Sequence, residues 1–191
     1  MIISDLKKVK PGYYELSIEE KKYLVTEDSV LKYRLFKGYE ISQKQLEECL
    51  VEDDFSKIKN KAFVYSLKYL KNGYETIRYL EDRGISYIEA KKAVEEIKKE
   101  GKLNEQALAN GIAAGLARSS NGPYMIRFKL KNRHFDSNVV EEALSSLVEE
   151  DILWGKEKLF KKADARFKSL SKIEKDCKMK ELLYRHGYES L

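Results

Sequence analysis

A six-residue motif occurs three times in this chain, and it constrains the fold more than any other feature of the sequence. Each copy has Leu, two spacer residues, Arg or His, then Gly or His, and finally an apolar residue; the copies begin at Leu80, Leu130 and Leu183. Gly readily adopts the left-handed backbone conformation that ends a helix, and the apolar residue after it packs back on that helix. Each copy therefore predicts a helix end followed by a turn into the next helix.

The copies start 50 and 53 residues apart, which is a spacing typical of tandem helical repeats. Stacked units of this kind bury a core together that no single unit could bury. We predict three three-helix units over residues 55–101, 102–150 and 151–191, the last one incomplete, in an elongated and mainly α-helical array. His134 stands where the other copies have Gly, so its turn is expected to be strained or differently shaped.

Capping signals indicate where the helices begin. A capping box pairs Ser, Thr or Asn with Glu or Gln three residues later, so that each side chain accepts a hydrogen bond from a free backbone N–H group. Such boxes begin at Ser42, Asn72 and Ser86, Asn104 is a further N-cap, and Gly122-Pro123 restarts the chain as a helix. Apolar residues at spacings of three and four also predict a helix over roughly 55–70, distinct from the one that begins after Ser42.

Residues 1–54 are predicted to form a small β-containing extension before the helical body. The candidate strands, which alternate apolar and polar residues or follow charged turns, are residues 2–9, 13–18 and 22–25. A short helix is expected to begin near Thr26 or Asp28. No stretch rich in Pro, Gly or Ser separates this extension from the helices.

Composition excludes several classes of protein. With 42% hydrophobic and 36% charged residues, the chain is too apolar to be simply disordered and too charged to lie in a membrane. No apolar run approaches the ~18 residues of a membrane span, and the N-terminus does not resemble a signal peptide. Cys49 and Cys177 form no Cys-x-x-Cys pair, which favours reduced thiols. We expect a cytoplasmic monomer without a membrane partner.

Signatures of catalysis and of metal binding are scarce. The sequence has no Gly-rich phosphate loop ending in Lys-Ser or Lys-Thr, and no His-Glu-x-x-His motif. Its two histidines, His134 and His186, occupy equivalent turns of different units, so a shared metal site would need further ligands. We therefore predict no catalytic residue, no metal site and no cofactor, and hence no enzyme.

Positive charge is concentrated outside the N-terminal extension. Residues 1–54 carry 9 Lys or Arg and 12 Asp or Glu, although the whole chain has a net charge of +5. In the helical body, the middle helix of each unit and the first helix of the third unit are basic. The predicted partner-binding residues are Arg78, Arg83, Arg127, Lys129, Lys131, Arg133, Lys161, Lys162, Arg166, Lys178, Lys180 and Arg185. If the units stack in register, these cations form a ridge that suits an anionic partner; a merely solvated face is the alternative.

Aromatic residues lie among these cations, and they leave two interpretations open. Tyr124, Phe128 and Tyr184 could anchor an interface or stack on bases, or they could belong to the core. Trp154 is expected to pack between the second and third units. A DNA-reading helix-turn-helix at Arg83 is disfavoured, because the helix that would enter the groove carries as many carboxylates as cations.

Several of these segments together resemble the RecX family of regulatory proteins. The pattern Leu103-Asn104-Glu105-x-x-Leu108-Ala109, with Gly122-x-x-x-Ile126-x-x-x-Leu130-x-x-Arg133, resembles the middle RecX repeat, and Met179-x-x-x-Leu183-x-Arg185-His186-Gly187-Tyr188 is similar to the third. The segment from Glu27-Asp28 to Lys37-Gly38 resembles the N-terminal extension of RecX proteins from low-GC Gram-positive bacteria. His134 in place of Gly, and an end before the last helix of the third repeat, depart from the family pattern.

The resemblance implies a non-enzymatic negative regulator of the RecA recombinase. Proteins of this family bind the groove of RecA–DNA filaments and inhibit ATP hydrolysis, strand exchange and co-protease activity. The implied partner is the RecA filament, and single- or double-stranded DNA stays open as a direct partner. The residues alone leave two alternatives: a general DNA-binding helical repeat protein without a recombinase target, and a structural adaptor.

Overall fold

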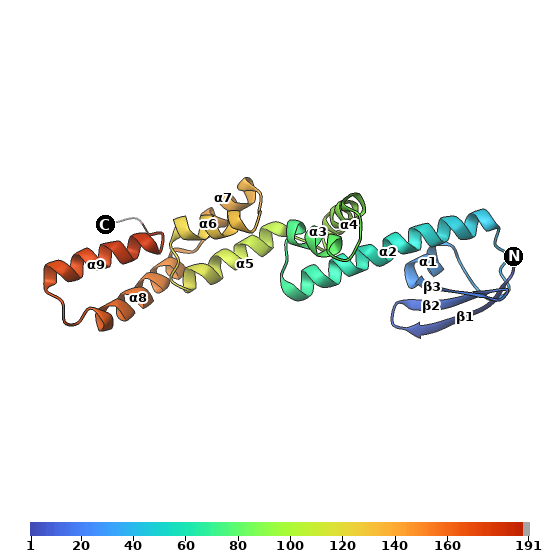
Figure 1. Ribbon diagram of the computed structural model, residues 1–191, viewed down its shortest axis with the longest axis horizontal. Coiled ribbons are helices and arrows are strands. Elements are labelled where there is room, and N and C mark those ends of the chain that lie inside the picture. Colours follow the sequence, from blue (N-terminus) through green and yellow to red (C-terminus); the bar gives the residue numbers. More distant parts are fainter. Residues whose placement is uncertain (189–191) are drawn as a thin grey trace. The chain divides into compact units, whose positions relative to one another are not determined.

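The computed structural model describes residues 1–188, and it confirms a mainly helical fold with a small N-terminal β-sheet (Figure 1). The chain forms two compact units. The first comprises residues 1–71 and 76–102, and the second comprises residues 72–75 and the chain from Leu103 onward. Each unit is described by itself below.

The first unit begins with the predicted sheet. Strands β1 (Ile3–Lys10), β2 (Tyr13–Ile18) and β3 (Lys21–Thr26) pair antiparallel in that order, and they are followed by α1 (Glu27–Lys32) and α2 (Gln43–Tyr69). The sheet, α1 and the first part of α2 lie together in Figure 1. Alternation along the strands turns one set of side chains inward. The buried core of this region consists of Ile3, Leu16, Ile18, Val25, Leu35, Ile41, Leu46 and Cys49.

A buried carboxylate joins α2 to the start of α1. The side chain of Asp53 is fully buried, and its Oδ1 accepts hydrogen bonds from Thr26 N (2.6 Å), Thr26 Oγ1 (2.7 Å) and Ser29 Oγ (2.7 Å). Its Oδ2 lies 2.9 Å from Lys57 Nζ. Burial alone would raise the pKa of Asp53, but these hydrogen bonds and the ion pair hold that pKa below its ordinary value of 3.8.

The helix α2 differs from the prediction. A capping box at Ser42 starts it as expected, but it runs without interruption for 27 residues, so the separate helix expected over roughly 55–70 is wrong. The pair Asp53-Asp54 lies inside α2, where Asp53 faces inward and its Oδ1 accepts hydrogen bonds from Thr26 and Ser29. The division of the chain into repeats stays a prediction, and its first boundary, between residues 54 and 55, falls within α2.

Two further helices complete the first unit. The predicted capping box at Ser86 begins α4 (Tyr87–Lys99), which packs against α2, and α3 (Gly73–Glu81) precedes it. The residues that these helices bury include Ala62, Leu80, Ala90, Ala93, Val94 and Ile97. Small Ala side chains at these contacts let the helices approach closely.

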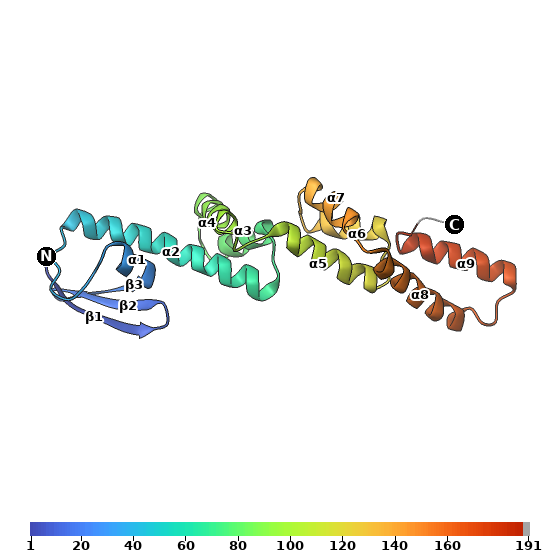
Figure 2. The ribbon, with the colours of Figure 1, turned by 180° about the vertical axis from the view of Figure 1, so that it is seen from behind.

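The second unit contains five described helices: α5 (Glu105–Arg118), α6 (Pro123–Asn132), α7 (Ser137–Ser145), α8 (Glu149–Arg166) and α9 (Lys172–Arg185). The predicted N-caps, Asn104 and Gly122, begin α5 and α6. Ala109, Ala113 and Ala117 of α5 pack with apolar residues of α6 and α7 in one core. Helices α8 and α9 lie side by side, as both views show (Figure 1, Figure 2), around Leu159 and Leu183.

All three copies of the repeated motif form the predicted helix-ending turn. Gly84 (φ 78°), His134 (φ 59°) and Gly187 (φ 77°) all adopt the left-handed conformation. The apolar residue after each one donates its N–H to the Leu carbonyl that begins the motif, from Ile85 to Leu80 (3.2 Å), Phe135 to Leu130 (3.3 Å) and Tyr188 to Leu183 (3.0 Å). The His134 turn therefore has the same shape as the others, and a non-Gly residue bears the strain of it.

The last of these turns is held against the start of α6. Gly122 N donates to His186 O (2.7 Å), and Tyr124 N donates to Gly187 O (3.1 Å). The backbones approach so closely that a Cβ atom on Gly187 would lie 2.3 Å from Met125 N. This contact places the end of α9 beside the end of α5, where the hollow described next is found.

Candidate functional site

The basic residues predicted on α6 share that helix, but most of their charged groups have partners within the second unit. Arg127 makes a two-pronged ion pair with Glu141, from Nε to Oε1 (2.8 Å) and from Nη2 to Oε2 (2.7 Å). This hydrogen bonding raises the pKa of Arg127 and lowers that of Glu141. Arg133 Nη2 lies 2.6 Å from Glu75 Oε2. These two arginines are therefore partly neutralised.

The two lysines of α6 differ in their surroundings. Lys129 Nζ donates to Asn121 Oδ1 at 2.7 Å. Lys131 is exposed and has no hydrogen-bond or ion-pair partner within residues 1–188. Among the basic residues of α6, Lys131 is therefore the cation most accessible to a partner.

The cations predicted on α9 are also partly paired. Glu181 binds both Arg185 and Lys178, and these hydrogen bonds lower the pKa of Glu181. Lys180 is exposed, and the described part of the chain gives it no carboxylate partner.

In the first unit, Arg83 is part of an aromatic stack on α3. Its guanidinium carbon lies 3.6 Å from the centre of the Tyr79 ring, and Tyr79 stacks on Tyr65 with ring centres 3.5 Å apart. Arg78 is exposed on the same helix. The alignment of Arg78 and Arg83 with the cations of the second unit stays a prediction.

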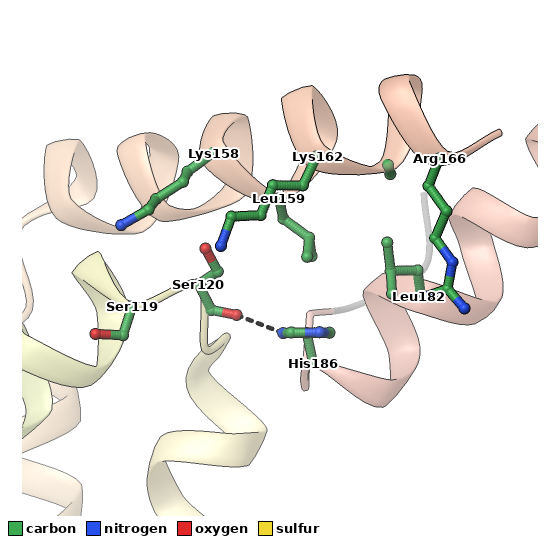
Figure 3. A pocket seen from close by; sticks show the side chains of 9 residues that line it. Ser119, Ser120, Lys158, Leu159, Lys162, Arg166, Leu182 and His186 are labelled. Atoms are coloured by element: carbon green, nitrogen blue, oxygen red, sulfur yellow. Dashed lines mark hydrogen bonds between the residues drawn. The ribbon is translucent and has the colours of Figure 1, made fainter. Parts of the chain in front are cut away.

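The predicted cations of α8 border a hollow. Lys161, Lys162 and Arg166 are all exposed, and Lys162 and Arg166 line a hollow of about 390 Å³ together with Lys158 (Figure 3). The three lining cations stand four residues apart, on one face of α8, since residues at this spacing are neighbours on a helix. Lys158 is not among the predicted binding residues, although its spacing of four from Lys162 in the sequence places the two on one helix face.

The other walls of the hollow come from the ends of α5 and α9. Ser119 and Ser120 follow α5, and His186 follows α9. His186 Nδ1 lies 2.7 Å from Ser120 O, and because a carbonyl oxygen can only accept, the ring donates this hydrogen bond (Figure 3). Leu159 and Leu182 provide apolar surface, and none of the described residues that line the hollow is a carboxylate. The positive charge of this lining suits an anion.

The aromatic residues among the cations are exposed, so they do not belong to the core, and their role in an interface stays a prediction. Tyr124 and Phe128 lie on the surface of α6, and the side chain of Tyr184 is 77% exposed on α9. The expectation that Trp154 packs between two units is wrong, because its side chain is 53% exposed on α8. Lys158 lies against its ring, with Nζ 5.0 Å from the ring centre.

The described residues contain no cluster of three or more His, Cys, Asp or Glu side chains arranged to hold a metal ion. Within the same part of the chain, none of the helices combines the length and the apolar character that crossing a bilayer requires.

Comparison with known proteins finds relatives of one kind. No family model matches the sequence. The regulatory protein RecX of Lactobacillus delbrueckii subsp. bulgaricus is 28% identical over 181 residues, or 94% of this chain and 67% of that protein. RecX of Lactococcus lactis subsp. cremoris is 28% identical over 177 residues, covering 91% of this chain and 62% of that protein. RecX of Streptococcus gordonii is 30% identical over 148 residues, which are 76% of this chain and 57% of that protein.

Two solved structures have the same fold. A crystal structure of regulatory protein RecX superimposes with a TM-score of 0.74 and 20% identity, over 99% of this chain and 95% of that one. The crystal structure of RecX from Lactobacillus salivarius gives a TM-score of 0.64 with 22% identity, over 72% of this chain and 90% of that one.

These relatives and these solved structures are all RecX proteins, and this chain resembles them over most of its length. The resemblance seen in the sequence is thereby confirmed, including the β-containing N-terminal region. The RecX relatives are named as regulatory proteins and not as enzymes, in agreement with the predicted non-enzymatic role. The chain spans about two thirds of the length of the first RecX relatives that it matches, 67% and 62%.

Proposed function

We propose that this chain is a negative regulator of the RecA recombinase, which binds RecA–DNA filaments and inhibits ATP hydrolysis, strand exchange and co-protease activity. The observation that carries the proposal is its relationship to regulatory proteins named RecX over 94% of its length. Exposed cations without a carboxylate partner among the described residues support binding to an anionic assembly. Each of them can pair with a negative charge of the partner without first breaking an ion pair within the chain.

The partner-binding residues that we propose are the twelve predicted cations, and they are unequal in availability. Lys131, Lys161, Lys162, Arg166 and Lys180 are exposed and have no carboxylate partner within residues 1–188. Arg127 and Arg133 bind Glu141 and Glu75. Reversing the charge of either arginine would place two carboxylates together and disturb the fold, so neither is a clean probe of binding.

The experiment is RecA-catalysed ATP hydrolysis on single-stranded DNA, measured with increasing amounts of this chain. We expect hydrolysis to fall at near-stoichiometric amounts of the chain. A double variant, Lys131→Glu with Lys180→Glu, should inhibit less, because two contacts become repulsive. The matched control reverses two exposed lysines outside the predicted set, Lys44→Glu with Lys91→Glu, and should inhibit like the parent protein.

The alternative, a DNA-binding repeat protein without a recombinase target, gives a different result in the same assay. Such a protein would slow hydrolysis only by occupying the DNA, so an excess of single-stranded DNA would restore the full rate. Inhibition that persists in excess DNA supports the recombinase as target. Absence of inhibition at near-stoichiometric amounts would overturn the proposal.

A further inference from the structure

The hollow beside α8 brings three cations of one helix together. Lys158, Lys162 and Arg166 face it from successive turns, about 6 Å apart along the helix axis, since each residue adds 1.5 Å. None of the three has a hydrogen-bond or ion-pair partner within residues 1–188, and no carboxylate lines the hollow. Three like charges that converge without a counter-charge repel one another, and an anion in the hollow would remove that repulsion.

Two acidic residues of α8 bind cations that lie outside the hollow. Asp164 pairs with Lys175 of α9 at 2.9 Å, and Asp151 binds Arg118 of α5 at 2.8 Å. Neither carboxylate therefore neutralises the cations that line the hollow. His186 also removes one obstacle to an anion, because it hydrogen-bonds the carbonyl of Ser120 that would otherwise face the ligand.

Aromatic rings adjoin the cations at both ends of the row. Lys158 Nζ lies 5.0 Å from the centre of the Trp154 ring, and Arg166 Cζ lies 5.8 Å from the centre of the Phe167 ring. Trp154 is more than half exposed. A row of cations that ends on exposed aromatic surface is the arrangement with which proteins hold single strands: the cations follow the backbone and the rings stack on bases.

We propose that this hollow binds the phosphodiester backbone of a single-stranded nucleic acid. Lys158, Lys162 and Arg166 contact the phosphates, and a base adjacent to them stacks on Trp154. A carboxylate-rich protein segment would satisfy the same cations, but it would make no use of the aromatic ring. This site acts without the recombinase, so it goes beyond the function proposed above, and each can fail without the other.

The experiment uses the chain alone and an oligothymidylate of about 16 nucleotides, the upper size for such a site. Trp154 is the only tryptophan, so its fluorescence reports directly on one end of the hollow. We expect saturable quenching by the oligonucleotide. Inorganic phosphate and polyglutamate, at equal charge concentration, should not quench. Affinity is measured independently from the fluorescence anisotropy of a labelled oligonucleotide at several salt concentrations.

Two triple variants test which cations are responsible. Lys158→Ala with Lys162→Ala and Arg166→Ala should abolish the quenching and reduce the slope of log K against log salt by about 2, since each phosphate contact in a single strand contributes about 0.7. The matched control, Lys91→Ala with Lys168→Ala and Lys172→Ala, removes the same charge from exposed positions outside the hollow and should stay close to the parent. Replacing Trp154 by Leu should weaken binding about tenfold in the anisotropy assay.

Three results would overturn this inference. They are an absence of quenching and binding by the parent protein, an equal loss of affinity in both triple variants, and equally tight binding of polyglutamate. Circular dichroism checks that each variant is folded, which the exposure of all six replaced side chains leads us to expect. Because no recombinase is present, none of these outcomes bears on RecA inhibition.

Discussion

Replacing Asp53 should weaken the attachment of the N-terminal sheet region to α2. In Asp53→Ala, Thr26 N–H loses its acceptor inside the protein, and the hydroxyls of Thr26 and Ser29 keep each other, at 3.1 Å, with Ser29 N–H donating to Thr26 Oγ1 at 3.4 Å. Lys57 also loses its buried partner. A hydrogen bond to a charged group contributes about 1.5–3 kcal/mol, and removing one partner of a buried charged cluster costs about 3–5 kcal/mol. We expect the free energy of unfolding to fall by about 4 kcal/mol.

Asp53→Asn separates the role of the charge from that of the acceptor. The amide oxygen can still accept from Thr26 N–H, so we expect a loss of only about 2 kcal/mol in the free energy of unfolding. Urea denaturation followed by far-UV circular dichroism measures both variants. Equal losses for Ala and Asn, or a loss below about 1 kcal/mol for Ala, would refute the reasoning that the buried hydrogen bonds hold this region.

The lowered pKa of Asp53 adds a pH dependence to the same comparison. A carboxylate whose pKa is lower when folded contributes stability above its unfolded pKa, and this contribution is lost as the pH falls through the folded pKa. The difference in unfolding free energy between parent and Asp53→Asn should therefore shrink as the pH falls below about 4. A difference that stays constant down to about pH 2 would show that the charge does not matter.

Two further substitutions test the repeated turn. Gly187→Ala should lower the free energy of unfolding by about 3 kcal/mol, because the new Cβ would lie 2.3 Å from Met125 N. Gly84→Ala should lower it by only about 1 kcal/mol, because Gly84 has a similar φ but nothing within 4 Å of the new Cβ. Equal shifts of the two urea denaturation midpoints would contradict this prediction. The His134→Gly variant should be more stable than the His134→Ala variant by about 1 kcal/mol. Both variants lose the ring contact with Tyr74, but only Ala keeps the strain of the left-handed conformation. If thermal denaturation shows the Ala variant to be at least as stable as the Gly variant, backbone strain is not the explanation.

The turns and helix starts could be predicted from the sequence because their causes are local. Leu80 and Ile85 are joined by one hydrogen bond across five residues, and the same interaction joins Leu130 to Phe135. Such interactions depend on a few neighbouring residues, so their pattern is visible in the sequence alone. His134 stands where the other two copies have Gly, and this difference adds strain to the turn without changing its shape.

The length of α2 could not be predicted in the same way. The sequence places two carboxylates at Asp53-Asp54, and acidic runs usually lie in solvent near helix ends. In the structure Asp53 lies inside the helix and is buried, with a hydrogen bond to Thr26, 27 residues earlier. Whether Asp53 is buried depends on its tertiary partner, and the periodicity of the sequence carries no information about that partner.

The same limit applies to the candidate site, and it changes which cations matter. The sequence correctly placed Arg127 and Arg133 on one helix, but their partners are 14 and 58 residues away. Folding brings carboxylates to α6 and directs those of α8 away from its hollow. A count of Lys and Arg along the sequence therefore weights both helices alike, whereas the charge that an anionic partner meets depends on what remains after internal pairing. The hollow of α8, which the described residues line with three cations and no carboxylate, is therefore the place to test binding first, ahead of the basic residues of α6.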